Sequence, residues 1–497
     1  MNETRQKLKL WDLPALDSRV KSPNVTLAEM IFGYFLGPFL VLAMTTVIST
    51  YYLTFYRTYD DIVSNASSFL VLLPLISVIP MALANIIVGI ILGRTQTRQG
   101  KARPLLFTAA PLLLLSGLVM FLIPYLSLGF RLAWMAITYN IFAAVANPVY
   151  SNSHYLMVSL STRNLDQRGK LSVISNIPAV AGNGLISSIV MPVVLSWINS
   201  APHVLNGEEV GQMIVQNRWQ TIMVIFAVLA FIGCLLEYLF TRERITEEDI
   251  SADLVTEPKE TIPSAVQLKS AAKDKFWWIV MVFYALYQMG VMFKGGYVFN
   301  IFCHEFYTEG VQLLGYTVAA DNVQALVALV GGVPLAVGML FAWPVANKMG
   351  KRNFMILGCI LSVIGSVICL LGPGNILILL VGQVVKGFSS IPGAYIMMAL
   401  FADVLDHLEA RFGYRVDGVS MSVYSTILTG VNGLAVAFFN LVYDGGVFSR
   451  QAVCSFFFLA FEIIAHGILI FVLLALNVEK NIQAEQQLIA NRKAGKA

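Results

Sequence analysis

The sequence predicts an all-α membrane protein with twelve transmembrane helices in two halves of six. Its 497 residues are 57% hydrophobic and only 12% charged, which is too apolar for a soluble fold. A helix needs roughly 20 apolar residues to cross the hydrocarbon core of a bilayer. Because the apolar runs are long and continuous, helices rather than alternating barrel strands must satisfy the backbone. The predicted runs lie near residues 27–56, 66–93, 105–124, 131–156, 171–198, 219–241, 276–302, 321–346, 353–372, 375–402, 417–444 and 452–477.

Lysines and arginines predict which side of the membrane each loop faces. Residues 1–26 are polar, include Pro14 and Pro23, and have no cleavage-type small-residue site, so they are expected to form a cytoplasmic tail. The loops after the even-numbered helices are then inside, and most basic residues fall there. The net charge of +4 therefore belongs to the inner membrane face, with the lipid bilayer rather than nucleic acid as the partner. The outer side keeps Arg57, Arg131, Arg218, Arg450 and, as a further candidate, Lys294.

A hydrophilic stretch at residues 242–275 separates the two predicted halves. Each half has a short basic loop after its second helix, at 93–104 and at 347–352. Paired halves are typical of the major facilitator superfamily, in which substrate binds near the midplane and the halves rock to give alternating access. The sequence has no repeated filter loop, which favours a carrier over a channel. The predicted parts are an N-terminal cytoplasmic tail (1–26), a first half (27–241), a cytoplasmic linker (242–275), a second half (276–477) and a C-terminal cytoplasmic tail (478–497).

Enzyme motifs are missing from the sequence. It contains no H-E-x-x-H, no G-x-x-x-x-G-K-[ST] and no G-x-S-x-G motif. Its five cysteines are scattered without a C-x-x-C pair, which argues against a metal site or a disulfide framework. We therefore expect no enzyme activity and no cofactor, and transport driven by an ion gradient or by the substrate gradient.

Three loop and helix motifs resemble one transporter family. The stretch G-R-T-Q-T-R-Q-G-K-A-R-P at 93–104 resembles the D-R-T-x-x-x-x-G-[KR]-x-[RK]-P signature of the glycoside-pentoside-hexuronide:cation symporters. The segments A-D-V-L-D-H-L-E at 402–409 and G-Y-R-V-D-G at 413–418 are similar to the family's A-D-x-x-D and G-x-R-x-[ED]-G. The residues Asn147-Pro148-x-Tyr150 are similar to its N-I-P-Y. The resemblance spans about residues 27–477 and implies a sugar transporter coupled to Na⁺ or H⁺.

The charged residues of these motifs are candidates for a cytoplasmic gate. Arginine and lysine at helix ends can pair with aspartates, and such pairs can break and form again as the halves move. The alternative is that they only anchor the loops at the lipid headgroups. The predicted gate residues are Arg94, Arg98, Lys101, Arg103, Asp403, Asp406, Arg415 and Asp417.

The family's cation site is altered in this sequence. The resemblance implies two aspartates in helix two, but Met81 and Asn85 occupy these positions, and Ile86 replaces the following proline. A hard cation prefers carboxylate oxygens, so coupling of the usual kind is not expected. Other charged residues of the family are also replaced: its helix-eleven lysine falls on Thr429 and its helix-five arginine on Asn176. Na⁺ or H⁺ remains the candidate coupling ion.

A polar, mostly uncharged set of side chains is the predicted substrate site. Amides can donate and accept hydrogen bonds and aromatic rings can stack on sugar rings, so the set suits a glycoside. The alternative is helix packing, because buried amides also join transmembrane helices. The predicted substrate-binding residues are Asn147, Tyr150, Asn176, Lys386, Tyr395, Tyr424, Ser425 and Thr429.

Lys386 is the one charged member of that set. It lies near the middle of helix ten, where an ionisable group is costly and is a functional candidate by default. It could bind an anionic sugar or replace the missing cation by its own fixed charge. The alternative is an ion pair with Glu462 in helix twelve. Glu462 and His466, one turn apart, are in turn candidate proton carriers.

Together these features predict a secondary active transporter of glycosides, as a multi-pass protein of the cell membrane with both ends in the cytoplasm. The alternatives are a sugar uniporter, a sensor that binds sugar without transporting it, and a carrier of lysolipids.

Overall fold

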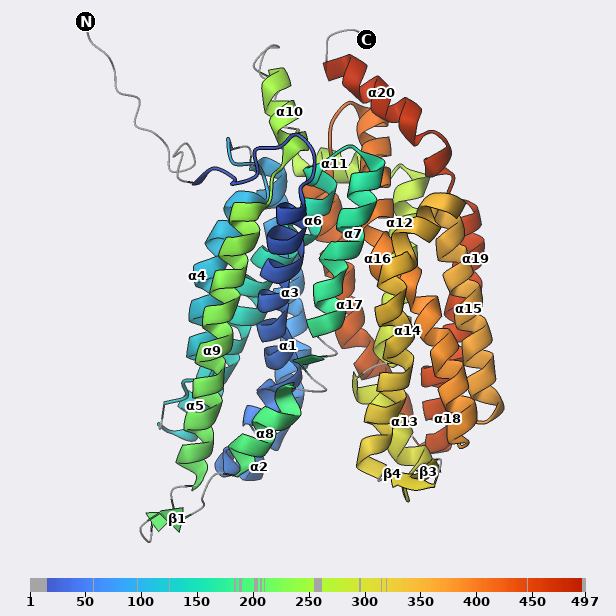
Figure 1. The fold of residues 1–497 in the computed structure, drawn as a ribbon. Coiled ribbons are helices and arrows are strands. Elements are labelled where there is room, and N and C mark those ends of the chain that lie inside the picture. The colour runs from blue at the N-terminus through green and yellow to red at the C-terminus, as the bar shows by residue number, and fades with distance from the viewer. Residues whose placement is uncertain are drawn as a thin grey trace, which may run out of the picture. The chain divides into compact units, whose positions relative to one another are not determined.

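The computed structural model describes residues 16–493 except 57, 96, 125, 183–184, 187–189, 201–203, 206–207, 210, 254–261, 295, 314, 319 and 445. Nearly all of this chain is helical (Figure 1). Two compact units can be separated by their contacts. The first consists of Met1–Leu268, Val416–Ser422 and Leu488–Ala497, and the second of Lys269–Arg415 and Val423–Gln487. The main boundary, at Leu268, falls inside the predicted linker.

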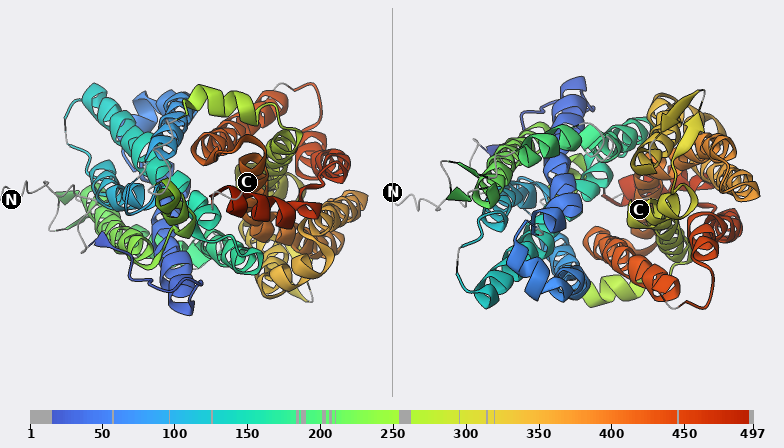
Figure 2. Two further views of the ribbon diagram at one scale, coloured as in Figure 1. Left: turned by 90° about the horizontal axis from the view of Figure 1, so that it is seen from above. Right: turned by 90° about the horizontal axis from the view of Figure 1, so that it is seen from below.

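In the first unit, α9 packs along both α1 and α4, so that the three helices lie side by side (Figures 1 and 2). A π-helical segment, η3, leads into α1, and another, η4, joins α5 to α6. Such wide turns are frequent at functional sites. The elements are η3 (Glu29–Leu36), α1 (Gly37–Tyr56), α2 (Asp60–Asn65), α3 (Ser67–Arg94), α4 (Arg103–Met120), α5 (Leu128–Ile141), η4 (Phe142–Ala146), α6 (Asn147–Ser161), α7 (Leu165–Ala181), α8 (Met191–Asn199), β1 (Val204–Leu205), β2 (Glu208–Glu209), α9 (Gly211–Phe240), α10 (Arg244–Asp253) and α11 (Ser264–Ala271).

In the second unit, α15 packs against both α16 and α19, and α14 packs against α16. The strands β3 and β4 form an antiparallel hairpin. Helix α17 contributes its first six residues to the first unit and the rest to the second. The elements are α12 (Lys275–Phe293), α13 (Gly296–Phe306), β3 (Val311–Leu313), β4 (Tyr316–Val318), α14 (Ala320–Met349), α15 (Lys351–Leu371), α16 (Ile376–Phe412), α17 (Asp417–Asp444), α18 (Arg450–Ser455), η6 (Phe456–Ala460), α19 (Phe461–Leu474), η7 (Val478–Lys480) and α20 (Ile482–Lys493).

The outer faces of the helices are apolar, as a bilayer requires. On α15, Leu357, Ile360, Ile364 and Val367 are all more than a third exposed. Their spacing of three and four residues places them on one face of the helix. The inner face of α15 instead buries small and polar residues such as Ser362 and Ser366. Helix α15 therefore presents an apolar surface to lipid and keeps its polar groups inside the unit.

The predicted apolar runs all coincide with helices in the described residues. Nine helices there are long and apolar enough to cross a membrane, or ten if the bent helix over Leu326–Met349 is one span. The run at 171–198 corresponds to α7 and α8, and the run at 417–444 corresponds to α17. The all-helical prediction is confirmed, whereas the count of twelve stays a prediction. The linker contains two short helices, α10 and α11, and its residues 254–261 lie outside the described part.

Candidate functional site

Tyr150, a predicted substrate ligand, lies in a buried ionisable cluster of the first unit. Its hydroxyl donates a hydrogen bond of 2.8 Å to Glu237 Oε2, and His154 Nδ1 lies 2.7 Å from Glu237 Oε1. All three side chains are at most 3% exposed. The rings of Tyr150 and His154 stack. Sequence reasoning missed Glu237 and His154, although ionisable residues inside apolar runs are the signal that finds such groups.

The two other amides of the predicted set in this unit lie apart from that cluster. Asn147 is half-buried at the start of α6, directly after the π-helical η4. Asn176 is half-buried on α7 and donates to the carbonyl of Ser172 in its own helix. Among the described hydrogen bonds, none joins Asn147, Tyr150 and Asn176 to one another. Their role as sugar ligands stays a prediction.

Near Met81 and Asn85, the predicted equivalents of the family's cation site, an amide pair joins two helices. Asn85 Oδ1 of α3 accepts a hydrogen bond of 2.8 Å from Asn152 of α6, which also donates to the carbonyl of Pro148. Both side chains are buried, and the nearby Met81 adds no oxygen. The described residues contain no cluster of three or more His, Cys, Asp or Glu side chains that could hold a metal ion. This part of α3 is thus built as a neutral helix contact.

In the second unit, the predicted ligands on α16 and α17 contact residues of this unit. The ring of Tyr424 stacks on Tyr284 with a centroid distance of 3.7 Å, and Thr429 donates to the carbonyl of Ser425. The Tyr395 hydroxyl donates to the carbonyl of Leu335 on α14. All of the predicted ligands on α16 and α17 are buried, so any sugar contact needs a change in their surroundings.

Lys386 pairs with Glu462, which is the alternative that the sequence offered. The distance from Lys386 Nζ to Glu462 Oε2 is 2.8 Å, and each side chain is 2% exposed. Lys294, at the end of α12, also lies within 3.4 Å of this carboxylate. Ser362 and Ser366 of α15 donate hydrogen bonds to the same two oxygens. The sequence analysis gives Lys294 only as a further candidate for the outer side and does not predict its part in this cluster.

The basic loop of the first unit is held by a buried glutamate. The backbone N–H groups of Lys101, Ala102 and Arg103 each donate a 2.8 Å hydrogen bond to the carboxylate of Glu243. A carboxylate at a helix N-terminus satisfies unpaired donors and favours the helix dipole. Gly100 precedes them with φ of +116°, where a side chain would meet the Glu243 carboxylate.

The basic loop of the second unit has the same construction. Glu479 accepts hydrogen bonds from the backbone N–H groups of Lys351 and Arg352, at 2.7 and 3.1 Å. Gly350 precedes them with φ of +89°. In both units, therefore, a glutamate that follows the last long helix caps the helix after the basic loop. Neither glutamate was predicted, because each contact joins residues more than 100 positions apart.

Six of the eight predicted gate residues take part in ion pairs within their own units. In the first unit, Arg103 is buried and donates to the carbonyls of Tyr238 and Gln99. Further pairs in this unit join Lys101 to Asp417 at 3.9 Å and Arg98 to Asp17 at 3.7 Å. In the second unit, Lys351 bonds Asp403, and Arg415 pairs with Asp406 and Glu409 at 3.1 and 3.0 Å. Arg94 is exposed. Opening of these pairs during gating stays a prediction.

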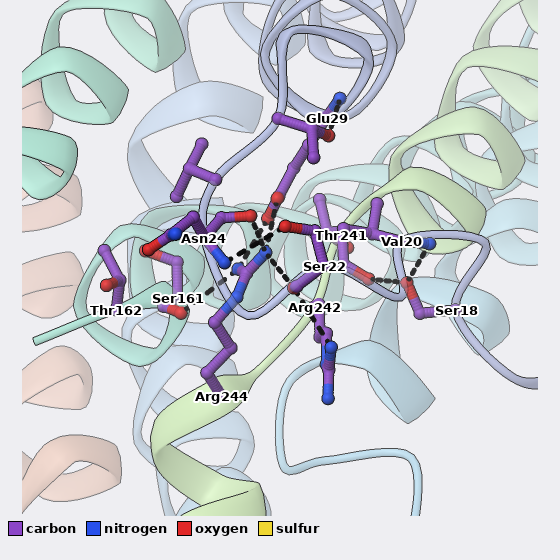
Figure 3. Close-up of polar contacts among 12 residues, drawn as sticks. Ser18, Val20, Ser22, Asn24, Glu29, Ser161, Thr162, Thr241, Arg242 and Arg244 are labelled. Atoms are coloured by element: carbon purple, nitrogen blue, oxygen red, sulfur yellow. Dashed lines mark hydrogen bonds and ion pairs between the residues drawn. The ribbon is translucent and has the colours of Figure 1, made fainter.

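Each unit has a further charged cluster that includes a residue of the predicted linker. Arg244 donates to both carboxylate oxygens of Glu29, and also to the carbonyls of Ser22, Asn24 and Ser161 (Figure 3). In the second unit, Asp274 caps α12, with bonds from the backbone N–H groups of Phe276 and Trp277.

Asp274 is also the acceptor for two cationic side chains. His407 lies 3.3 Å from its Oδ2, and Arg411 donates a hydrogen bond to the same atom. Burial raises the pKa of the Asp274 carboxyl, but the hydrogen bonds from His407, Arg411 and the Trp277 N–H, with the charge of His407, outweigh burial and lower the pKa to about 2. Its contribution to stability is therefore present above pH 4 and is lost only as the pH falls towards 2.

Comparison with known proteins decides the family. The sequence profile of the family described as MFS/sugar transport protein matches residues 33–476. The chain belongs to this family. The transporter is 25% identical to the isoprimeverose transporter of Lactiplantibacillus pentosus over 422 residues, which cover 84% of this chain and 80% of that one. It is 22% identical to the glucuronide carrier protein homolog of Escherichia coli K12 over 349 residues, covering 69% and 68%.

Solved structures show the same fold. The proton:xylose symporter matches the transporter with a TM-score of 0.62 at 14% identity, covering 89% of this chain and 94% of that one. The E. coli fucose:proton symporter matches with a TM-score of 0.61 at 12% identity, covering 89% and 97%. These identities are low, so they establish the major facilitator fold alone. With the family match, they confirm the predicted fold class and the resemblance to glycoside-pentoside-hexuronide symporters.

Proposed function

We propose that this multi-pass membrane protein moves a glycoside across the cell membrane by alternating access of two six-helix halves, with both chain ends in the cytoplasm. The observation that carries the proposal is the family match over residues 33–476. The names of the relatives support glycosides as the substrate class: an isoprimeverose transporter, a glucuronide carrier protein homolog and a raffinose carrier protein. The raffinose carrier protein, of Pediococcus pentosaceus, is 20% identical over 345 residues, which cover 68% of this chain and 49% of that one. The protein requires no cofactor for this activity, and H⁺ or Na⁺ is the candidate coupling ion.

The ion pairs of the predicted gate residues support the mechanism. Asp403, Asp406 and Asp417 are all buried and paired with basic side chains of their own unit. Paired charges of this kind can exchange partners when an element moves, at a smaller cost than unpaired charges would carry. The same residues carry the family motifs in the sequence.

A sugar uniporter is the second candidate function. The observation that favours it is the neutral hydrogen bond between Asn85 and Asn152, since Asn85 is one of the two positions at which the resemblance implies a carboxylate. A uniporter exchanges sugar at equal rates in the presence and absence of ion gradients.

Exchange in proteoliposomes tests the proposed function. The purified protein is reconstituted in vesicles loaded with isoprimeverose, raffinose or a glucuronide, and entry of the labelled sugar is measured against protein-free vesicles. We expect at least one of the three to exchange. If the protein binds a sugar without exchanging any, it is a sensor. If only a labelled lysolipid moves, it is a lipid carrier.

A further inference from the structure

A buried cluster of the second unit contains two ammonium groups and one carboxylate. Glu462 on α19 lies 2.8 Å from Lys386 Nζ and 3.4 Å from Lys294 Nζ. Lys386 lies ten residues after the start of α16, or about 15 Å along the helix axis, which is half the thickness of a hydrocarbon core. The cluster is thus deep inside the membrane-spanning part of the unit.

The local packing fits these groups closely. Gly365 of α15 faces Lys386, and a Cβ there would approach Lys386 Cγ to 2.8 Å. The ammonium group of Lys386 lies over the ring of Phe458, in the π-helical η6 that directly precedes α19. Ser362 and Ser366 hold the two oxygens of Glu462. These contacts fix one lysine and the carboxylate as a neutral pair.

The second lysine leaves one charge in excess. Among the described residues, Glu462 is the one carboxylate within 4 Å of either ammonium group. With both lysines protonated, the cluster carries a net charge of +1 in a region where an uncompensated charge is costly. Releasing one proton makes the cluster neutral. With two lysines and one carboxylate, the cluster can therefore bind and release one proton.

Of the two lysines, Lys294 is the better placed to exchange this proton. Its side chain is 19% exposed, against 2% for Lys386, and its Nζ donates a 2.8 Å hydrogen bond to Ser390. Lys294 directly follows the last residue of α12, and α13 begins at Gly296. A lysine at the junction of two helices can move relative to Glu462 when the angle at the junction changes.

The other titratable groups around the cluster come from all four helices that pack there. They are Tyr287 of α12, Cys359 and Cys369 of α15, Tyr395 of α16, and His466 of α19. Tyrosine and cysteine are neutral at pH 7 in such apolar surroundings. His466 Nδ1 lies 3.0 Å from the carbonyl of Glu462. It is the remaining neighbour that can take up a proton.

We propose that Lys294, Glu462 and Lys386 form the proton-binding site that couples transport to a pH gradient. Lys294 takes a proton from one side of the membrane, holds it as an ammonium ion against Glu462 and Ser390, and releases it to the other side. The inference rests on the proposed sugar transport, since a coupling proton needs a substrate to drive. It replaces the cation site whose positions are Met81 and Asn85.

The test measures proton entry and sugar exchange on the same proteoliposomes. The sugar is whichever of isoprimeverose, raffinose and the glucuronide exchanges. In the unaltered protein, we expect the addition of this sugar to change the internal pH. A gradient of one pH unit should accumulate the sugar up to about tenfold for one proton per sugar. Lys294→Gln leaves one lysine with one carboxylate, so the variant should fold and exchange sugar but accumulate none.

Two further variants separate proton transfer from a general charge effect. Lys294→Arg keeps the positive charge but does not release its proton, so we expect it to lose proton movement as Lys294→Gln does. Glu305→Gln, outside the cluster in the same unit, should keep coupling; Glu305 accepts a hydrogen bond from Tyr443.

The possible results distinguish the two proposals. If no sugar exchanges in the unaltered protein, the proposed function fails. If sugar exchanges in the unaltered protein without proton movement, the proton site alone is overturned. Coupled transport that survives in Lys294→Arg or Lys294→Gln would also overturn the site.

Discussion

At the residue scale, single carboxylates organise the basic loops. Glu243 accepts bonds from three consecutive backbone N–H groups and from the hydroxyl of Thr246, and it is 1% exposed. Removing one partner of such a set leaves buried donors unsatisfied, which costs more than the hydrogen bonds themselves contribute. Glu243 is therefore expected to matter for stability although it belongs to no family motif of the sequence.

Glu243→Ala should lower the free energy of unfolding by about 1–3 kcal/mol, because three N–H groups lose their acceptor. Glu248→Ala is the matched control: Glu248 is half-exposed and pairs with Arg163 at the surface, where an ion pair contributes about 0–1 kcal/mol. Thermal melting in detergent compares the two variants. Equal melting temperatures would contradict the capping role.

Asn85→Ala should lower the free energy of unfolding by about 0.6–2 kcal/mol, because Asn152 loses a hydrogen bond between helices. Met81→Leu replaces an apolar side chain by one of similar size, so it should change the free energy of unfolding little. The melting temperature in detergent, with and without Na⁺, measures both effects. A rise in the melting temperature with Na⁺ that Asn85→Ala abolishes would show instead that Asn85 still holds a cation.

At the element scale, both units build the turn before a helix in the same way. A glycine with positive φ precedes the first N–H groups of α4 and of α15, and a glutamate from beyond the last long helix of that unit caps them. The repeated basic loops were visible in the sequence because they are local. The capping glutamates were not, because their partners lie 140 and 128 residues away along the chain.

Gly100→Ala and Gly350→Ala should both destabilise the protein, by about 1–3 kcal/mol, because a side chain strains this backbone conformation. Gly100→Ala should cost more, since the added carbon would lie 2.4 Å from the Glu243 carboxylate, against 3.3 Å from Glu479 Oε2 at Gly350. Gly467→Ala, in α19 with no atom within 4 Å of the added carbon, should stabilise by up to about 1 kcal/mol. Melting curves measure all three variants. If Gly467→Ala lowered the melting temperature as much as Gly100→Ala and Gly350→Ala do, this interpretation would be contradicted.

At the scale of the whole molecule, apolar runs are enough to predict helices and their order. Each predicted run coincides with one helix or with consecutive helices, since about 20 apolar residues in sequence have few other stable conformations in a bilayer. Partners of buried polar groups are different, because helices far apart in the sequence supply them. The ion pair between Lys386 and Glu462 was predicted as an alternative because both residues lie deep in their predicted helices, and the structure contains this pair. Lys294 was missed because it lies inside the predicted run 276–302, and a lysine with its long side chain can reach the membrane surface from such a run.

The central claim is that this protein transports a glycoside through alternating access. The most direct test is counterflow: proteoliposomes loaded with unlabelled isoprimeverose are diluted into a trace of the labelled sugar. We predict that the labelled sugar enters and transiently exceeds its outside concentration, because one substrate site exchanges between the two sides. Raffinose and a glucuronide follow in the same assay. If labelled sugar enters no faster than in protein-free vesicles for all three, the account is contradicted.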